Sequence, residues 1–317
     1  MKKIFLLLPL IALVLLVSGC VGPGSGGPSE LPGSGNGVII EKITTEPIVD
    51  DDAQSFQVRL NIKNNGERLA TNVWPELGGA ASSFNPALKF PSVTPIDELY
   101  GIKKEPDGKI IEGESAPVTF ELRPFNVLQD TDFKFRGHVW YQYSTVASRK
   151  INIATREELS RLRDATGSVN LAFDELTTVS KGPLKVDIKS ASVARVSASK
   201  PTVRVSIYIK NEGEGLLTPK YGGSGFERDN LVNIRVESQE LSSSGNGCNS
   251  GTIELFQGKD TTLTCDFIVN DIPETVSEKL LQVVLDYNYR FDLPADPNAG
   301  VVTRVVDSGE AQRPVAP

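Results

Sequence analysis

Histidine is almost absent from this chain, since His138 is the only one among 317 residues. A metal site built from several histidines is therefore excluded, and a serine–histidine–carboxylate triad would have to use His138. No nucleophile-elbow motif accompanies it. Strand alternation places His138 on the face opposite Val139 and Tyr141, which predicts a surface position. The sequence thus predicts no catalytic residue and a protein that is not an enzyme.

Cysteine is scarce too, with Cys20, Cys248 and Cys265 the only three. The last two lie close together in the second half of the chain, and two sulfurs without a nearby histidine fall short of the four ligands of a zinc site. We therefore expect no metal and no cofactor. Outside the cytoplasm such a pair forms a disulfide, so we predict a Cys248–Cys265 bond. The alternative is two free thiols, with Cys265 filling a core position as Phe120 does in the first half.

Positive charge is in deficit, because 33 lysine and arginine residues face 40 aspartate and glutamate residues, a net charge of −7. Nucleic acid binding needs a positive face, so this balance argues against a nucleic acid partner. Acidic residues form one run, Asp50-Asp51-Asp52. The run lacks the alternating aspartates and the glycine of a calcium loop, so we expect a solvated turn there.

Long hydrophobic runs are also missing, apart from Ile4 to Val17. This run falls short of the roughly 20 residues of a membrane-spanning helix. It has the length of a signal-peptide core, and a lysine pair precedes it. Val17-Ser18-Gly19-Cys20 follows, and this sequence resembles the lipobox of prokaryotic lipoproteins.

The lipobox resemblance implies that residues 1–19 are a signal peptide, that cleavage occurs before Cys20, and that the Cys20 thiol carries a diacylglyceryl group. The first partner would then be membrane lipid, bound through Cys20 on the extracytoplasmic face of the cell membrane. Residues 20–37 are rich in glycine and proline, the composition of a flexible tether. An uncleaved membrane anchor and simple secretion are the two alternatives.

An internal repeat is the most informative feature that is present. Three pairs of segments match in the same order at nearly constant offset, which indicates a duplicated unit. They are Phe56–Asn72 with Val203–Pro219 at an offset of 147, Glu112–Leu122 with Gln257–Phe267 at 145, and Tyr141–Tyr143 with Tyr287–Tyr289 at 146.

Each matched segment has the pattern of a strand and a turn. In the first pair, apolar residues alternate with polar ones, and an Asn-x-Gly sequence follows at 64–66 and again at 211–213. No long helical pattern occurs inside either unit. Short alternating strands separated by such turns predict an all-β protein of two tandem immunoglobulin-like antiparallel β-sandwiches.

The order of a strand, an N-x-G turn and a later V/L-T-F/C strand resembles the CARDB-like and related immunoglobulin-like modules of bacterial and archaeal surface proteins. The resemblance covers most of both units. It implies an immunoglobulin-like fold and a cell-surface setting, and it supplies no active site, because these modules share no catalytic residues.

The predicted domain order places the first sandwich at 38–154, a helical linker at 155–182 and the second sandwich at 183–294. A mostly disordered tail is predicted over 295–317, apart from the apolar stretch Val301–Val306. In the linker, Thr155 and Glu158 have the spacing of a capping box, which predicts a short helix from Thr155 to Asp164.

Two tryptophans, Trp74 and Trp140, are the candidate ligand-binding residues. An exposed indole can stack on a sugar ring. The competing interpretation, which we prefer, is that Trp140 packs against a sheet edge or the linker helix. The segments 78–110 and 221–251 are the least similar parts of the two units. Loops that differ between duplicated frameworks are where ligand specificity is expected.

The sequence therefore predicts a membrane-anchored surface lipoprotein with a structural or protein-binding role in the cell envelope. Its partner would be an envelope protein or a glycan. The main alternative is a carbohydrate-binding envelope protein that uses its aromatic residues, and a hydrolase is a distant third.

Overall fold

A computed structural model describes residues 36–80, 94–124, 127–167, 177–191, 193–197, 201–219, 221, 229–238, 240–243, 248–293 and 300–307. The predicted signal peptide, the lipidation site Cys20 and most of the predicted tether lie outside these residues. The described chain belongs to one compact unit, Ser34–Pro317. Within it, no helix is both long and apolar enough to cross a membrane.

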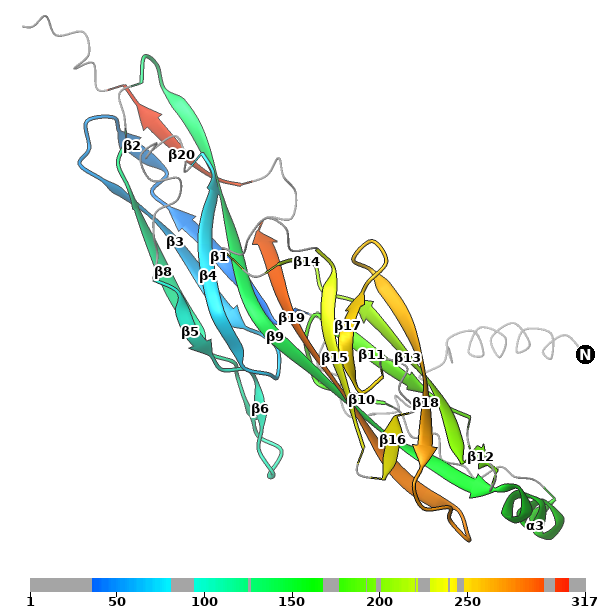
Figure 1. Cartoon of the computed structure of the whole chain (residues 1–317). Helices are drawn as coiled ribbons and strands as arrows, with labels where there is room; N and C mark the ends of the chain where they lie inside the picture. The colour runs from blue at the N-terminus through cyan, green and yellow to red at the C-terminus, as the bar shows by residue number, and fades with distance from the viewer. Residues whose placement is uncertain are drawn as a thin grey trace, which may run out of the picture. The chain divides into compact units, whose positions relative to one another are not determined.

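The protein is mostly β, with several sheets whose strand pairs are almost all antiparallel (Figure 1). Two smaller sheets come from the two repeats. The first has the order β1 (Val38–Thr45), β3 (Phe56–Asn64), β8 (Ser115–Leu122), and the second β11 (Leu184–Lys189), β13 (Thr202–Asn211), β18 (Asp260–Val269), β16 (Leu241–Ser243).

An 11-stranded sheet combines strands of both repeats. Its main order is β17 (Ser250–Glu254), β15 (Leu231–Glu237), β19 (Ser277–Leu293), β9 (Thr131–Thr155), β20 (Val301–Val306), β2 (Ile48–Asp50). Five strands join it at the side: β4 (Ala70–Gly79), β5 (Ile96–Leu99), β10 (Thr178–Val179), β12 (Ala194–Val196) and β14 (Leu216–Leu217). A separate hairpin consists of β6 (Lys103–Lys104) and β7 (Ile110–Ile111).

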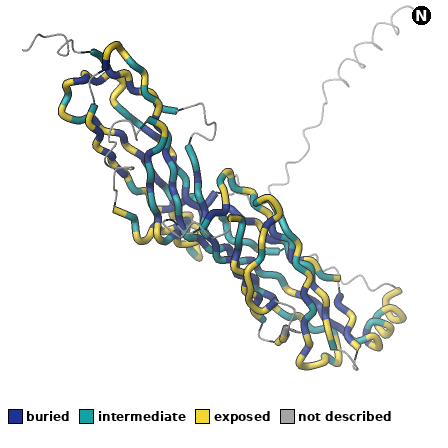
Figure 2. Tube along the Cα trace, turned by 45° about the horizontal axis from the view of Figure 1, so that its top comes forward, coloured by how far each residue is buried: buried dark blue, intermediate teal, exposed yellow. Residues whose placement is uncertain are grey.

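The segments in which apolar and polar residues alternate form strands, as the sequence predicts. Along β3, Phe56, Val58, Leu60 and Ile62 are buried while the residues between them are more exposed, and β13 repeats this with Val203, Val205, Ile207 and Ile209. Figure 2 shows the same alternation along most strands. Most buried hydrophobic side chains of the three larger sheets belong to one hydrophobic cluster.

The two smaller sheets pack against the large one. The ring of Phe56 on β3 lies 6.0 Å from that of Phe135 on β9. At Gly137 of β9 a Cβ atom would meet Ile40 and Leu60, so the three-stranded sheet approaches β9 closely there. In the second repeat, the Arg149 guanidinium of β9 donates a hydrogen bond to a carbonyl of β11.

The long pairing of β9 with β19 joins the repeats. These strands pair antiparallel over the whole of β19, and Tyr143 lies opposite Tyr287 while Tyr141 lies opposite Tyr289. The same two Tyr-x-Tyr motifs are equivalent in the sequence repeat. A segment is thus paired with its own copy, which defines a local two-fold axis between Gln142 and Asn288.

The four tyrosines of these motifs form one buried cluster on the inner side of the ladder. Their ring centroids lie 5.7 to 6.3 Å apart, within the range of favourable aromatic pairs. Burial raises the pKa of Tyr289 to about 12, although a hydrogen bond accepted from the Gly215 N–H and one donated to the Asn211 Oδ1 oppose the rise. The hydroxyl groups are therefore neutral at physiological pH and can both donate and accept.

The Asn-x-Gly turns are held to this cluster in the same way in both repeats. In the first, the Asn64 Oδ1 accepts the Gly66 N–H at 3.1 Å, and the Tyr143 hydroxyl accepts the Arg68 N–H at 3.0 Å. At Gly66 a Cβ atom would overlap that hydroxyl.

The second repeat has the matching set. The Asn211 Oδ1 accepts the Gly213 N–H at 3.1 Å, and the Tyr289 hydroxyl accepts the Gly215 N–H at 3.0 Å. Residues that match in the sequence repeat therefore also form equivalent tertiary hydrogen bonds in the two halves of the chain.

The chain enters this unit at its centre. Asn36 is buried, its Oδ1 accepts the Glu214 N–H at 2.8 Å, and the Gly37 carbonyl accepts the Asn65 N–H at 2.7 Å. Each of these two residues thus binds the turn of a different repeat.

Helix α3 (Arg156–Thr166) confirms the predicted short helix. Thr155 is its N-cap and accepts the Glu158 N–H at 3.3 Å, as predicted. The Glu158 carboxylate binds Arg161 at 2.7 and 2.8 Å. Gly167 ends the helix with a φ of 72°, which favours glycine.

The predicted disulfide is confirmed. Cys248 and Cys265 are bonded, with their Cα atoms 5.7 Å apart. Both are buried, and Cys265 occupies a core position in β18. The bond ties the segment before β17 to the four-stranded sheet.

Two features differ from or refine the sequence picture. Asp51 is not solvated, because it is only 5% exposed and its carboxylate accepts the Val127 N–H at 3.2 Å.

The apolar stretch Val301–Val306 forms β20, which pairs with both β2 and the start of β9. At the other end, β9 pairs with β10 and β12, so it continues beside strands that follow the helix. The predicted domain boundaries stay predictions.

We predict that Tyr143→Phe lowers the free energy of unfolding by about 1–3 kcal/mol, because it leaves the N–H of Arg68 without its buried partner and removes one of the two hydrogen bonds that the Lys181 carbonyl accepts. Chemical denaturation measures the change. Tyr100→Phe is the matched control, since the Tyr100 hydroxyl binds Glu98 at the surface, and it should change stability by less than about 0.5 kcal/mol. Equal losses in the two variants would contradict the role given to Tyr143.

Candidate functional site

The outer face of the β9–β19 ladder carries a continuous array of polar and aromatic side chains. We call it the axial face and define it by His138, Trp140, Gln142 and Ser144 of β9 and Asp286, Asn288, Arg290 and Asp292 of β19. These residues alternate with the buried tyrosines, so they point to the other side of the sheet. The register places a complementary partner opposite each one: Asp292 opposite His138, Arg290 opposite Trp140, Asn288 opposite Gln142 and Asp286 opposite Ser144.

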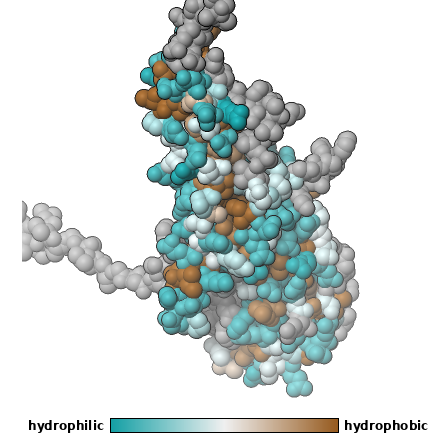
Figure 3. Space-filling model, turned by 90° about the vertical axis from the view of Figure 1, so that its left-hand side faces the viewer, coloured by the Kyte–Doolittle hydropathy of each residue, from teal (hydrophilic) through white to brown (hydrophobic). Residues whose placement is uncertain are grey.

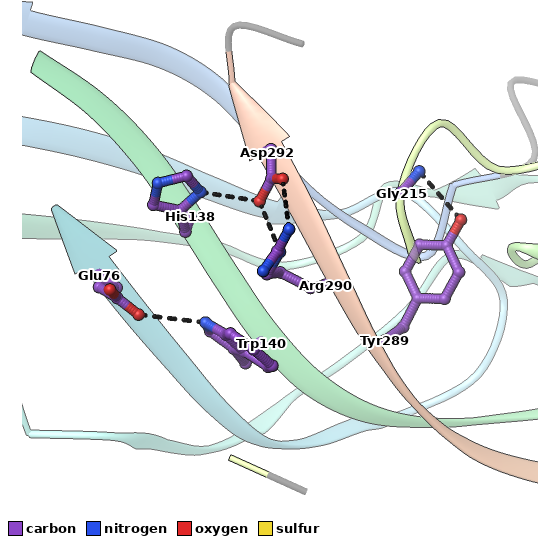
Figure 4. A network of polar contacts seen from close by, with 7 residues as sticks. All are labelled: Glu76, His138, Trp140, Gly215, Tyr289, Arg290 and Asp292. Atoms are coloured by element: carbon purple, nitrogen blue, oxygen red, sulfur yellow. Dashed lines mark hydrogen bonds and ion pairs between the residues drawn. The ribbon is translucent and has the colours of Figure 1, made fainter. Parts of the chain in front are cut away.

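An ion pair lies at one end of the axial face (Figure 4). The His138 Nδ1 is 2.7 Å from the Asp292 carboxylate, and the Arg290 guanidinium is 3.0 Å from the same group. Burial raises the pKa of Asp292, but the hydrogen bond from His138 and the charge of Arg290 outweigh it and hold that pKa below its usual value. The carboxylate is therefore charged and partnered at neutral pH.

The other nitrogen of His138 is packed against strand β4. A Cβ atom at Gly78 would lie 2.5 Å from the His138 Nε2, so the backbone of Gly78 covers that atom. A general base needs a nucleophile within hydrogen-bond distance of its free nitrogen. This packing instead gives His138 a structural position between two strands.

The two candidate tryptophans meet in one cluster. Trp74 of β4 lies opposite Trp140 of β9, and the Trp140 Nε1 donates to the Glu76 carboxylate at 3.2 Å. The ring of Tyr221 stacks on Trp74 at 4.9 Å and meets Trp140 edge-on at 5.6 Å. The Arg290 guanidinium lies over the Trp140 ring at 5.1 Å, a cation–π contact.

Both indoles are half-buried by this packing. The preferred interpretation placed Trp140 against a sheet edge or the linker helix. In the structure it instead contacts Tyr221 and Arg290 of the second repeat. Tyr221 is equivalent to Trp74 in the sequence repeat, so equivalent positions stack on each other beside the local two-fold axis.

A groove of about 470 Å³ lies next to the aromatic cluster, over the Gln142–Asn288 and Ser144–Asp286 pairs of the axial face. Gln142 and Asn288 line both the groove and the small cavity under Tyr221. The groove is walled on one side by the turn that precedes β4 and on the other by β15. Its lining residues are Arg68, Leu69, Thr71, Gln142, Tyr143, Ser144, Asn233, Asp286, Tyr287 and Asn288.

Among the described residues, no group of three histidine, cysteine, aspartate or glutamate side chains is placed to hold a metal ion. The lipidation residue Cys20 lies outside the described part of the chain. Of the residues singled out in the sequence, the structure thus brings together Trp74, Trp140 and His138, and separately the two disulfide cysteines.

Sequence reasoning missed Tyr221, Arg290 and Asp292. The repeat contained the signal for Tyr221, because the offset of 147 places it at the position of Trp74. The other two become visible only when β9 is paired with its own copy, which sets Arg290 opposite Trp140.

Comparison with known proteins finds no family model that matches this chain and no curated protein that matches it. The resemblance to the lipobox and to CARDB-like modules therefore rests on the sequence motifs themselves.

We predict that the stability lost in Asp292→Asn depends on pH. Because the folded pKa of Asp292 is lowered, the carboxylate adds stability above its unfolded pKa of about 4 and loses this contribution as the pH falls through the folded value. The difference between wild type and variant, measured by urea denaturation from pH 7 to pH 2, should shrink over that range.

Asp266→Asn is the control for this experiment. Asp266 also pairs with an arginine, but the Arg204 side chain is 72% exposed, so solvent weakens that pair. The stability lost in Asp266→Asn should therefore be smaller at neutral pH. A wild-type advantage over Asp292→Asn that stays constant down to pH 2 would contradict the ion pair.

Proposed function

We propose that this protein is a lipid-anchored envelope protein whose folded part is a non-catalytic structural or protein-binding unit. In this proposal residues 1–19 direct export, Cys20 carries the lipid on the extracytoplasmic face of the cell membrane, and the following residues form the tether. The partner of the folded part is a protein or glycan of the envelope.

One observation carries the structural part of the proposal. The residues that the two repeats share in sequence are those that hold the framework: the asparagine and glycine of each turn and the tyrosine that binds it. The axial face differs between equivalent positions, for example Trp140 against Asp286 and Ser144 against Arg290. Duplication has therefore kept a scaffold and varied its surface, as expected of a binding or structural module.

We further propose that each repeat is an immunoglobulin-like sandwich. In support, each repeat supplies a small antiparallel sheet, and contacts such as that of Phe56 with Phe135 join the first of these to the large sheet. Each repeat also has a tyrosine whose hydroxyl binds a backbone N–H, as in the tyrosine corner of such folds.

Carbohydrate binding through Trp74 or Trp140 is the second candidate. Stacking on a sugar needs a free ring face, and Tyr221 and Arg290 already cover faces of these rings. A hydrolase is third, because the single histidine is bound to Asp292 and packed on Gly78.

The entry point of the chain supports a tether that ends at the folded unit. Asn36 and Gly37 are fixed to the turns of the two repeats. Force or motion transmitted along the tether would reach the junction of the repeats first.

The test is mass spectrometry of the mature N-terminus after expression of the full chain in a prokaryotic host. We expect a chain that begins at Cys20 and carries a diacylglyceryl group, recovered with the membrane fraction. Cys20→Ser is the control and should abolish both the lipid and the membrane association. An intact Met1, or an unmodified residue 20 in the wild type, would contradict the proposal.

A further inference from the structure

The groove on the axial face has the size of a small-molecule site, since its volume of about 470 Å³ lies within the usual range for ligand pockets. We propose that it binds a neutral saccharide of one or two sugar units. This deepens the proposed binding role by naming a ligand class and a site, and it uses residues other than the indole faces.

The chemistry of the lining favours a ligand with many hydroxyl groups. Thr71 and Ser144 supply hydroxyls, and Gln142, Asn233 and Asn288 supply amides, so donors and acceptors alternate around the groove. A sugar hydroxyl both donates and accepts, and it can therefore satisfy either kind of group.

Much of this hydrogen-bonding capacity is unused within the described residues. The side chains of Thr71, Ser144 and Asn288 have no protein partner among the described contacts. By contrast, the Gln142 Oε1 accepts from Asn72 at 2.6 Å, and the Asn233 Oδ1 accepts from Thr252 at 2.9 Å. The latter two contacts fix the orientation of the amides and leave their NH₂ groups without a partner among the described contacts.

The charges favour a neutral ligand. The groove has one cation, Arg68, and one anion, Asp286, which also lies 3.4 Å from Arg235. The two opposite charges leave the groove without a net charge that would select an ion, and both side chains can form charge-assisted hydrogen bonds with sugar hydroxyls. Leu69 is 37% exposed at the rim and offers an apolar surface for sugar C–H groups.

An apolar docking surface fits the described surface less well. The large exposed hydrophobic side chains lie on separate elements, for example Ile48 on β2, Phe256 in a turn and Leu280 on β19. Figure 3 shows a mostly hydrophilic face with separate brown patches. The groove, in contrast, is one continuous hollow lined mainly by residues with polar side chains.

The position on the local two-fold axis explains how such a site arises. Gln142 and Asn288 are equivalent in the repeat and lie opposite each other in the ladder, so a ligand above them contacts both repeats. The chain enters on the other side of the sheet, where Gly37 approaches the buried Tyr141 and Tyr143.

The test uses the full mature chain in a detergent without a sugar head group. A panel of neutral mono-, di- and oligosaccharides is presented both immobilised and free, and affinity for the free sugars is measured by titration calorimetry. Binding of free monosaccharides would identify a free sugar as the ligand, and binding only of oligosaccharide ends would identify an envelope glycan.

Two variants on one strand locate the site. Ser144→Ala removes a groove hydroxyl, while Ser148→Ala removes a hydroxyl four residues along the same face of β9, outside the groove. We expect Ser144→Ala and Asn288→Ala each to weaken binding about three- to tenfold, and Ser148→Ala to leave it unchanged. Thermal unfolding of each variant shows whether the fold is intact.

Two results would overturn the inference: no binding to any neutral saccharide on the panel, or binding that is unaffected by Ser144→Ala and Asn288→Ala in folded protein. Sensitivity to Trp140→Ala alone would assign the sugar to the tryptophan cluster instead. The saccharide measurements do not depend on lipidation at Cys20. A negative result in the lipidation test would therefore contradict the lipid anchor without contradicting the saccharide site.

Discussion

The antiparallel pairing of β9 with β19 is the interaction on which the rest of this structure depends. It joins a segment to its own copy, so the duplicated motifs that look distant in sequence lie side by side in space. The inner side of the ladder buries four tyrosines, and the outer side carries the axial face. One strand pair thus organises both the core at the junction and the candidate site.

This arrangement has the geometry of an isologous dimer interface within one chain. In such an interface equivalent residues meet at the two-fold axis, as Gln142 and Asn288 do in the ladder, and as Trp74 does with Tyr221 beside it. Because both copies lie in one chain, they can differ. The pair of Trp140 and Arg290 lies on one side of the axis, and the equivalent positions on the other side are Asp286 and Ser144. Because of this difference, one end of the axial face is aromatic and the other end lines the groove.

Local patterns were sufficient to predict much of the secondary structure. Alternation identified β3 and β13, the spacing of Thr155 and Glu158 identified the helix, and the proximity of two cysteines identified the disulfide. The pairing of β9 with β19 was not predictable in this way, because strand register between distant segments depends on tertiary packing. The burial of Asp51 has the same cause, since its partner Val127 lies far along the chain.

The candidate site was predictable only in part, for a related reason. Trp74 and Trp140 were recognisable by residue type, but their environment comes from Tyr221 and Arg290, which only the fold brings near them. The groove has no sequence motif, because its residues are mostly common polar types contributed by four separate segments.

The most direct test of the central claim is differential scanning calorimetry of the mature chain. If the ladder joins the repeats into one cooperative unit, unfolding should show a single transition whose calorimetric and van't Hoff enthalpies agree. Two resolved transitions, or a calorimetric enthalpy close to twice the van't Hoff value, would show that the repeats unfold independently and would contradict this account.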